Sequence, residues 1–143
     1  MFAKFDNDGC RNFGLLLLRV GIGFAFIIHG YPKIMGGVAQ WTWLGEQMGN
    51  LGITFAPALW GFMAAFSECI GGVMLVLGLG TRLAAFLMMS TMTIAVIHHL
   101  SKIPADPYGV YSHPLKMAVV FLSLIFLGGG KWSLERICCK KCK

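Results

Sequence analysis

The chain has 143 residues, of which 57% are hydrophobic and 13% are charged, and its mean hydropathy is +0.71. A soluble domain averages about 45–50% apolar and about 25% charged residues, so this composition excludes an ordinary soluble domain and indicates an integral membrane protein. The net charge of +6 does not indicate nucleic-acid binding, because the basic residues flank apolar runs and form no basic helix or aromatic–basic module. A bilayer core about 30 Å thick needs about 20 apolar residues per helix, which allows four spans in one membrane domain over residues 1–143.

The first predicted span covers residues 13–34, "FGLLLLRVGIGFAFIIHGYPKI". No small-residue cleavage site follows this run, so we expect a retained helix rather than a cleaved signal peptide. The loop after it contains "AQWTWLGEQMG", which mixes tryptophans with polar residues. That mixture is typical of the membrane interface and predicts a short interfacial segment.

Three more spans follow. The second covers residues 57–79 and begins with Pro57, a residue favoured in the first helical turn. The turn "GLGTR" leads to the third span at 83–100, and a loop rich in Pro and Gly leads to the fourth at 113–129. A basic tail with the sequence "CCKKC" ends the chain at 131–143. We therefore predict an all-α protein, a four-helix bundle in the membrane.

Lysine and arginine are distributed unevenly between the two predicted sides of the membrane. With the N-terminus inside, eight lie on the inner side and three on the outer side. The inner set is Lys4, Arg11, Arg82, Lys131, Arg136, Lys140, Lys141 and Lys143, and the outer set is Lys33, Lys102 and Lys116. The positive-inside rule then predicts a multi-pass protein of the bacterial cytoplasmic membrane with both termini in the cytoplasm.

Several segments resemble the DoxX family of small four-helix membrane proteins. They are "LRVGIGFAFIIHGYPKI" in the first span, "MGNLGI" in the loop after it, "SECIGGVMLVLGLGTRLAA" through the second and third spans, the histidine that ends the third span, and "GGGKWSLE" after the fourth. The resemblance implies a role in membrane redox chemistry, as in a subunit of a thiosulfate:quinone oxidoreductase or in partners of thiol-stress enzymes. Where the family often has an acidic residue at the start of the fourth span, this chain reads "SHPLKMA".

Glu68 lies deep in the second apolar span. On a helix it shares a face with Ala64, Gly71 and Gly72, a small-residue surface that another helix can approach closely. A charge at this depth costs at least about 2.5–3.5 kcal/mol and needs a partner or a proton. We expect Arg19 of the first span to be that partner. Two interpretations remain: the pair locks two helices together, or Glu68 accepts a proton beside a bound quinone or thiol substrate.

The histidines fall near the predicted outer side of the membrane. A convergent pair of His29 and His98 would suit hydrogen bonding to a quinone and transfer of its protons, because imidazole titrates near neutral pH. Interfacial histidines without a ligand, and a plain anchoring role for the arginines, are the alternatives. The candidate residues are Glu68, Arg19, His29 and His98 for catalysis, and Lys33, Thr91 and Arg82 for holding a cofactor.

The cysteine-rich tail contains a C-x-x-C formed by Cys139 and Cys142. No βαβ pattern surrounds it, so the analogy with thioredoxin fails and we interpret the segment as a basic tail at the membrane surface. Soft-metal binding and disulfide exchange by these thiols are the alternatives. We predict no metal site, because the histidines do not form a pair at i, i+4 and nothing specifies four ligands.

These observations favour an inner-membrane subunit of a quinone- or thiol-linked redox system, with a quinone-linked oxidoreductase subunit as the candidate enzyme class. Its expected partners are the lipid bilayer, a quinone, a soluble redox protein at the membrane and further copies of the chain. One alternative is a non-catalytic anchor or assembly subunit for soluble redox enzymes. A small transporter ranks third, because there is little polar lining between Glu68 and the outer histidines.

Overall fold

The computed structural model describes residues 8–101 and 107–141, with the backbone alone at 107–110 and 139–141. Several residues that entered the charge and cysteine arguments therefore lie outside the described residues or their side chains. Those outside altogether are Lys4, Lys102, Cys142 and Lys143, and those described by backbone alone are Cys139, Lys140 and Lys141.

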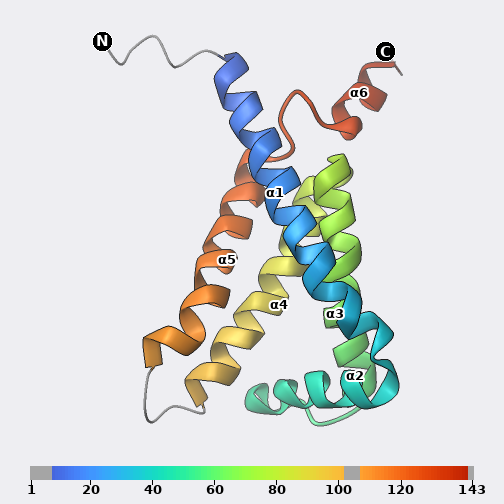
Figure 1. Ribbon diagram of the computed structural model, residues 1–143, viewed down its shortest axis with the longest axis vertical. Coiled ribbons are helices and arrows are strands. Elements are labelled where there is room, and N and C mark those ends of the chain that lie inside the picture. The colour runs from blue at the N-terminus through green and yellow to red at the C-terminus, as the bar shows by residue number, and fades with distance from the viewer. Residues whose placement is uncertain (1–7, 102–106, 142–143) are drawn as a thin grey trace.

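Four long helices form the bundle (Figure 1). They are α1 (Asp8–Met35), α3 (Pro57–Leu77), α4 (Thr81–Ser101) and α5 (Pro107–Leu127). Two short elements, α2 (Gly37–Gly45) and the 3-10 helix η1 (Glu46–Leu51), lie between α1 and α3, and α6 (Leu134–Lys141) follows α5. No strand occurs in the described ranges, so the expected all-α architecture is confirmed.

Three of these helices, α1, α3 and α4, are long and apolar enough to cross a membrane, and α5 carries a shorter apolar stretch at Tyr111–Leu127. Large apolar side chains on the outside, such as Leu17, Phe24 and Phe126, are more than half exposed. An apolar surface of this extent suits contact with lipid. The bounds differ slightly from expectation: α3 ends at Leu77 because Gly78 turns the chain with φ +70°, and α5 already begins at Pro107.

Close contact between α1 and α3 is made by glycines. A Cβ placed on Gly23 would lie 2.7 Å from the carbonyl oxygen of Gly72, and one on Gly30 would lie 2.7 Å from the backbone nitrogen of Cys69. The two helices run antiparallel, so these contacts fix which residues of α1 lie opposite which residues of α3. Small residues at such positions let membrane helices pack backbone to backbone.

A second set of contacts joins α3 and α4 to α5. Met88 of α4 packs against Gly71, and the buried core around it includes Leu75, Phe121 and Leu124. These residues lie in the half of the bundle away from α2. In Figure 1 the helices α4 and α5 diverge from α1 and α3 toward the end where α2 lies.

The segment formed by α2 and η1 crosses that end of the bundle (Figure 1), so the short segment expected after the first helix is present. The indole nitrogen of Trp41 donates a 3.0 Å hydrogen bond to the carbonyl oxygen of Lys33. This carbonyl belongs to the last turn of α1, where carbonyls have no partner within the helix. The ring of Trp41 also packs edge-on against Phe62, with centroids 5.0 Å apart. The α2–η1 segment is therefore fastened to both α1 and α3.

At the opposite end, Arg19 is fully buried. Its guanidinium donates to the carbonyl oxygens of Trp132, at 3.0 Å, and Leu75, at 3.5 Å. Leu75 belongs to the last turn of α3, and helix C-termini carry a partial negative charge that favours a cation. Gly78 has no side chain to block the guanidinium, which would otherwise collide with its Cβ.

The two ends of the described chain both lie at the Arg19 end of the bundle. Asp8 at the start of α1 forms ion pairs with Lys131, at 2.5 Å, and with Arg11, at 2.8 Å. Figure 1 shows the start of α1 and α6 at this same end. The side of the membrane on which this end lies remains a prediction from the charge distribution.

Replacing Gly61 by Ala should destabilise the α2–η1 segment, because the added Cβ would collide with the backbone of Trp41. Overpacking of this kind costs about 1–3 kcal/mol, so we expect a lower free energy of unfolding in mild detergent. Gly49→Ala is the matched control, since nothing lies within 4 Å of a Cβ at Gly49. Equal stability of the two variants would contradict the tight packing of α2 on α3.

Candidate functional site

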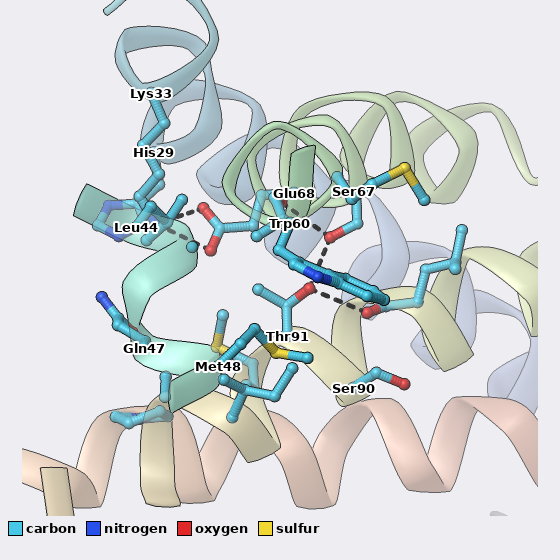
Figure 2. Close-up of a pocket in the computed structure, with 18 of the residues that line it drawn as sticks. His29, Lys33, Leu44, Gln47, Met48, Trp60, Ser67, Glu68, Ser90 and Thr91 are labelled. Carbon is cyan, nitrogen blue, oxygen red and sulfur yellow. Dashed lines mark hydrogen bonds and ion pairs between the residues drawn. The ribbon is translucent and has the colours of Figure 1, made fainter. Parts of the chain in front are cut away.

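A cavity of about 370 Å³, called here the pocket, lies between the helices beneath the α2–η1 segment (Figure 2). Residues from α1, α2, η1, α3, α4 and α5 line it, and its wall is mostly apolar. Figure 2 labels most of the polar side chains around it. The polar and charged residues of the wall are His29, Lys33, Gln47, Ser67, Glu68, Ser90, Thr91 and His113, together with the indoles of Trp43 and Trp60.

The only ion pair at the pocket, among the residues that the structure describes, joins Lys33 and Glu68. The Lys33 ammonium lies 2.6 Å and 2.8 Å from the two carboxylate oxygens of Glu68. The Glu68 side chain is 2% exposed and that of Lys33 is 21% exposed. The carboxylate thus has the partner that its burial requires. Because the ammonium has three donors and remains partly open, it can also donate to a ligand.

The expected pair between Glu68 and Arg19 is wrong. The contact of Gly23 with Gly72 sets an antiparallel register in which Glu68 faces the last turns of α1. Arg19 lies 14 residues before Lys33 on α1. That spacing is about 21 Å of helix. The same register places Arg19 beside the end of α3, where it binds carbonyl oxygens instead.

Two hydroxyl groups form a second polar patch in the pocket. The oxygens of Ser67 on α3 and Thr91 on α4 are 2.7 Å apart. Each is also within hydrogen-bond distance of a carbonyl of its own helix, that of Ala64 or Leu87. The two hydroxyl protons are therefore taken up within the protein, while lone pairs on both oxygens remain able to accept. Thr91, a candidate for holding a cofactor, therefore lines the pocket.

His29 and His113 approach the pocket from α1 and α5. The His29 ring packs edge-on near Phe26, with centroids 6.4 Å apart, and lies one turn before Lys33. In the sequence, His113 falls on the same predicted side of the membrane as the other histidines, but no pattern assigns it a role. The feature of the sequence that could have identified His113 is its position at the start of the fourth apolar run, where the family resemblance leads one to expect an acidic residue.

Three candidates lie elsewhere. His98 lines a smaller cavity of about 230 Å³ with Asn50, and its Nδ1 is 3.1 Å from the Asn50 amide nitrogen. The expected convergence of His29 and His98 is therefore wrong, since the two line different cavities. Arg82 is exposed near Gly128, at the same end of the bundle as Arg19. Neither arginine lines the pocket.

The arrangement is suited to a ligand with an apolar body and polar groups. Ligand sites are commonly apolar cavities of about 300–1,000 Å³ with a few polar groups that fix orientation. Here an ammonium, a carboxylate and two imidazoles are available at the wall. The ammonium and an imidazole N–H can donate hydrogen bonds to a carbonyl oxygen, and the carboxylate can take up or release a proton. Within the described residues, no group of three or more His, Cys, Asp or Glu is placed to hold a metal ion.

Comparison with known proteins identifies the class. The family model DoxX matches residues 14–100, more than half of the chain, and the chain belongs to the DoxX family. No solved structure matches it.

Three relatives are similar over most of their length. The inner membrane protein YphA of Escherichia coli K12 is 34% identical over 140 residues, covering 92% of this chain and 95% of YphA. A Bacillus subtilis protein named "Putative oxidoreductase CatD" is 32% identical over 113 residues, covering 78% of each chain. An uncharacterized protein of Haemophilus influenzae is 30% identical over 137 residues, covering 92% of this chain and 95% of that protein. Together with the apolar helices, these relatives support a multi-pass protein of the bacterial inner membrane.

Replacing Lys33 by Met should lower the free energy of unfolding by about 3–5 kcal/mol, because it leaves a buried carboxylate without its partner. The double variant Lys33→Met/Glu68→Met should recover most of that loss, since it removes both charges. Thermal and denaturant unfolding in mild detergent measures both effects.

The control for this pair is Lys131→Met, which removes an ion pair with Asp8 whose side chains are 47% and 56% exposed. Exposed pairs contribute about 0–1 kcal/mol, so this variant should be nearly as stable as the wild type. If Lys33→Met were no less stable than Lys131→Met, the Lys33–Glu68 pair would not hold the pocket end of the bundle together.

Proposed function

We propose that this protein is the quinone-binding membrane subunit of a redox system. The observation that carries the proposal is the buried Lys33–Glu68 pair in the wall of a mostly apolar pocket, with His29 and His113 beside it. A quinone combines a flat apolar ring with carbonyl oxygens that take up protons on reduction. The pocket provides both environments.

The position of the pocket favours a ligand that is dissolved in the bilayer. Met63 lines the pocket and is nevertheless 49% exposed on α3. Its neighbours on the outside of α3, Leu59 and Phe66, are 57% and 40% exposed and apolar. The pocket therefore reaches the surface that faces lipid, and a quinone ring could occupy it while the isoprenoid tail stays among the lipid chains.

The chemistry of reduction assigns a task to each group. A quinone becomes a quinol by taking two electrons and two protons, and we propose that a partner redox protein at the membrane supplies the electrons. The ammonium of Lys33 hydrogen-bonds one carbonyl oxygen and favours the negative charge that reduction places there. The Lys33–Glu68 pair then passes one proton to that oxygen and regains it through the imidazole of His29, while the second carbonyl oxygen takes the other proton from water. The name of the relative CatD supports a redox role for the family.

The test is the quinone content of protein purified in mild detergent, measured by extraction and mass spectrometry. We expect about one quinone per wild-type chain. The charge-free variant Lys33→Met/Glu68→Met should be folded and stable yet lose the quinone, because it removes the polar groups without leaving an unpaired charge.

Glu46→Gln is the matched control, because Glu46 is exposed and lines the smaller cavity instead of the pocket. It should retain quinone at the wild-type level. Absence of quinone from the wild type, both as purified and after addition of a short-tailed benzoquinone, would contradict the proposal. Retention of quinone by the charge-free variant would show that the ion pair only locks the helices and would favour an anchoring role.

A further inference from the structure

One hydrogen-bond donor at the pocket lacks a partner. The indole nitrogen of Trp60 is buried, yet no described residue accepts its hydrogen. The side chain belongs to the pocket wall (Figure 2). Most buried donors in proteins are paired, because an unpaired one destabilises the folded state. A donor left unpaired at a cavity wall is explained if the cavity's ligand supplies the acceptor.

The surroundings of Trp60 hold its ring in place. Its ring packs edge-on against Phe55, with centroids 5.9 Å apart. Trp41, the indole that fastens α2, differs from Trp60 because its nitrogen already donates to the carbonyl of Lys33. The lack of a partner at Trp60 is therefore a property of this position and not of every indole near the end of the bundle.

The nearby hydroxyl groups do not satisfy this indole within the protein. Trp60 and Ser67 lie seven residues apart on α3 and share a face of the helix. Ser67 is instead bonded to Thr91 and to the carbonyl of Ala64. Although lone pairs on the oxygens of Ser67 and Thr91 could accept, neither oxygen is bonded to the indole nitrogen, so its hydrogen is free for an acceptor on a ligand.

We propose that Trp60 donates from Nε1 to a second acceptor of the ligand, separate from the one that meets Lys33 and Glu68. This inference rests on the proposed quinone site and sharpens it. A ligand with one polar end would leave the indole unpaired, whereas a para-quinone carries carbonyl oxygens at opposite edges of its ring. Trp60 then acts as a positioning residue that selects ligands with two separated acceptors.

The test compares Trp60→Phe with the wild type, using a short-tailed benzoquinone labelled with ¹³C at its carbonyl carbons. The Phe ring keeps an aromatic group in the wall and removes the donor together with the five-membered ring, so the carbonyl bands, rather than affinity alone, report the lost hydrogen bond. Loss of one neutral hydrogen bond should weaken binding by about 3- to 10-fold. In the infrared spectrum, one of the two carbonyl bands should shift to higher frequency, because that carbonyl is no longer hydrogen-bonded. A change in packing alone would not produce that shift.

Trp132→Phe is the matched control, since Trp132 lies at the Arg19 end of the bundle and its ring packs against Phe13. It should leave both affinity and carbonyl bands unchanged. Unchanged binding and bands in a folded Trp60→Phe variant would overturn this inference and leave the proposed function intact. A wild-type protein that binds no quinone would overturn both.

Discussion

The ion pair between Lys33 and Glu68 is the interaction on which the pocket end of the bundle depends. Glu68 is almost completely buried, and an isolated charge in apolar surroundings is strongly unfavourable. The crossing of α1 and α3 must therefore keep Lys33 within reach of it. The same turn of α1 presents the carbonyl of Lys33 to Trp41, which holds the α2–η1 segment across the end of the bundle. Lys33 therefore links the register of α1 and α3, the position of the α2–η1 segment and the wall of the pocket.

The two ends of the bundle satisfy their buried charges in different ways. Arg19 is bound by carbonyl oxygens at the end of α3 and in the segment after α5, groups that do not titrate. Such an arrangement fastens the chain without offering a proton. Lys33 and Glu68 instead bind each other through side chains that carry acid–base groups, and they line a cavity. This difference distinguishes the end that is fastened through backbone carbonyls from the end at which we propose that the ligand binds, although both charged sites lie on the same pair of helices.

The helices and the inward direction of Glu68 could be predicted from the sequence, because apolar runs and a small-residue face are local patterns. The partner of Glu68 could not, because it depends on the register between α1 and α3. Gly21 and Gly23 are both small, but being two residues apart they lie on nearly opposite faces of α1. A Cβ at Gly21 would meet nothing within 4 Å while Gly23 contacts α3 closely, and only the folded structure shows which of these faces meets α3. The predicted convergence of His98 with His29 is wrong for a related reason. The 3-10 helix η1 brings Asn50 next to His98, and a sequence pattern does not show where such a segment packs.

The central claim is that the pocket at Lys33 and Glu68 holds a quinone, and labelling with a photoreactive azido-quinone tests it most directly. Illumination in membranes, followed by peptide mapping, should place the label within residues 26–33, 60–68 or 87–95, which contain most of the pocket wall. Excess unlabelled quinone should suppress this labelling. Label that spreads over lipid-facing residues such as Leu17 and Phe126, and that excess quinone does not displace, would contradict the account.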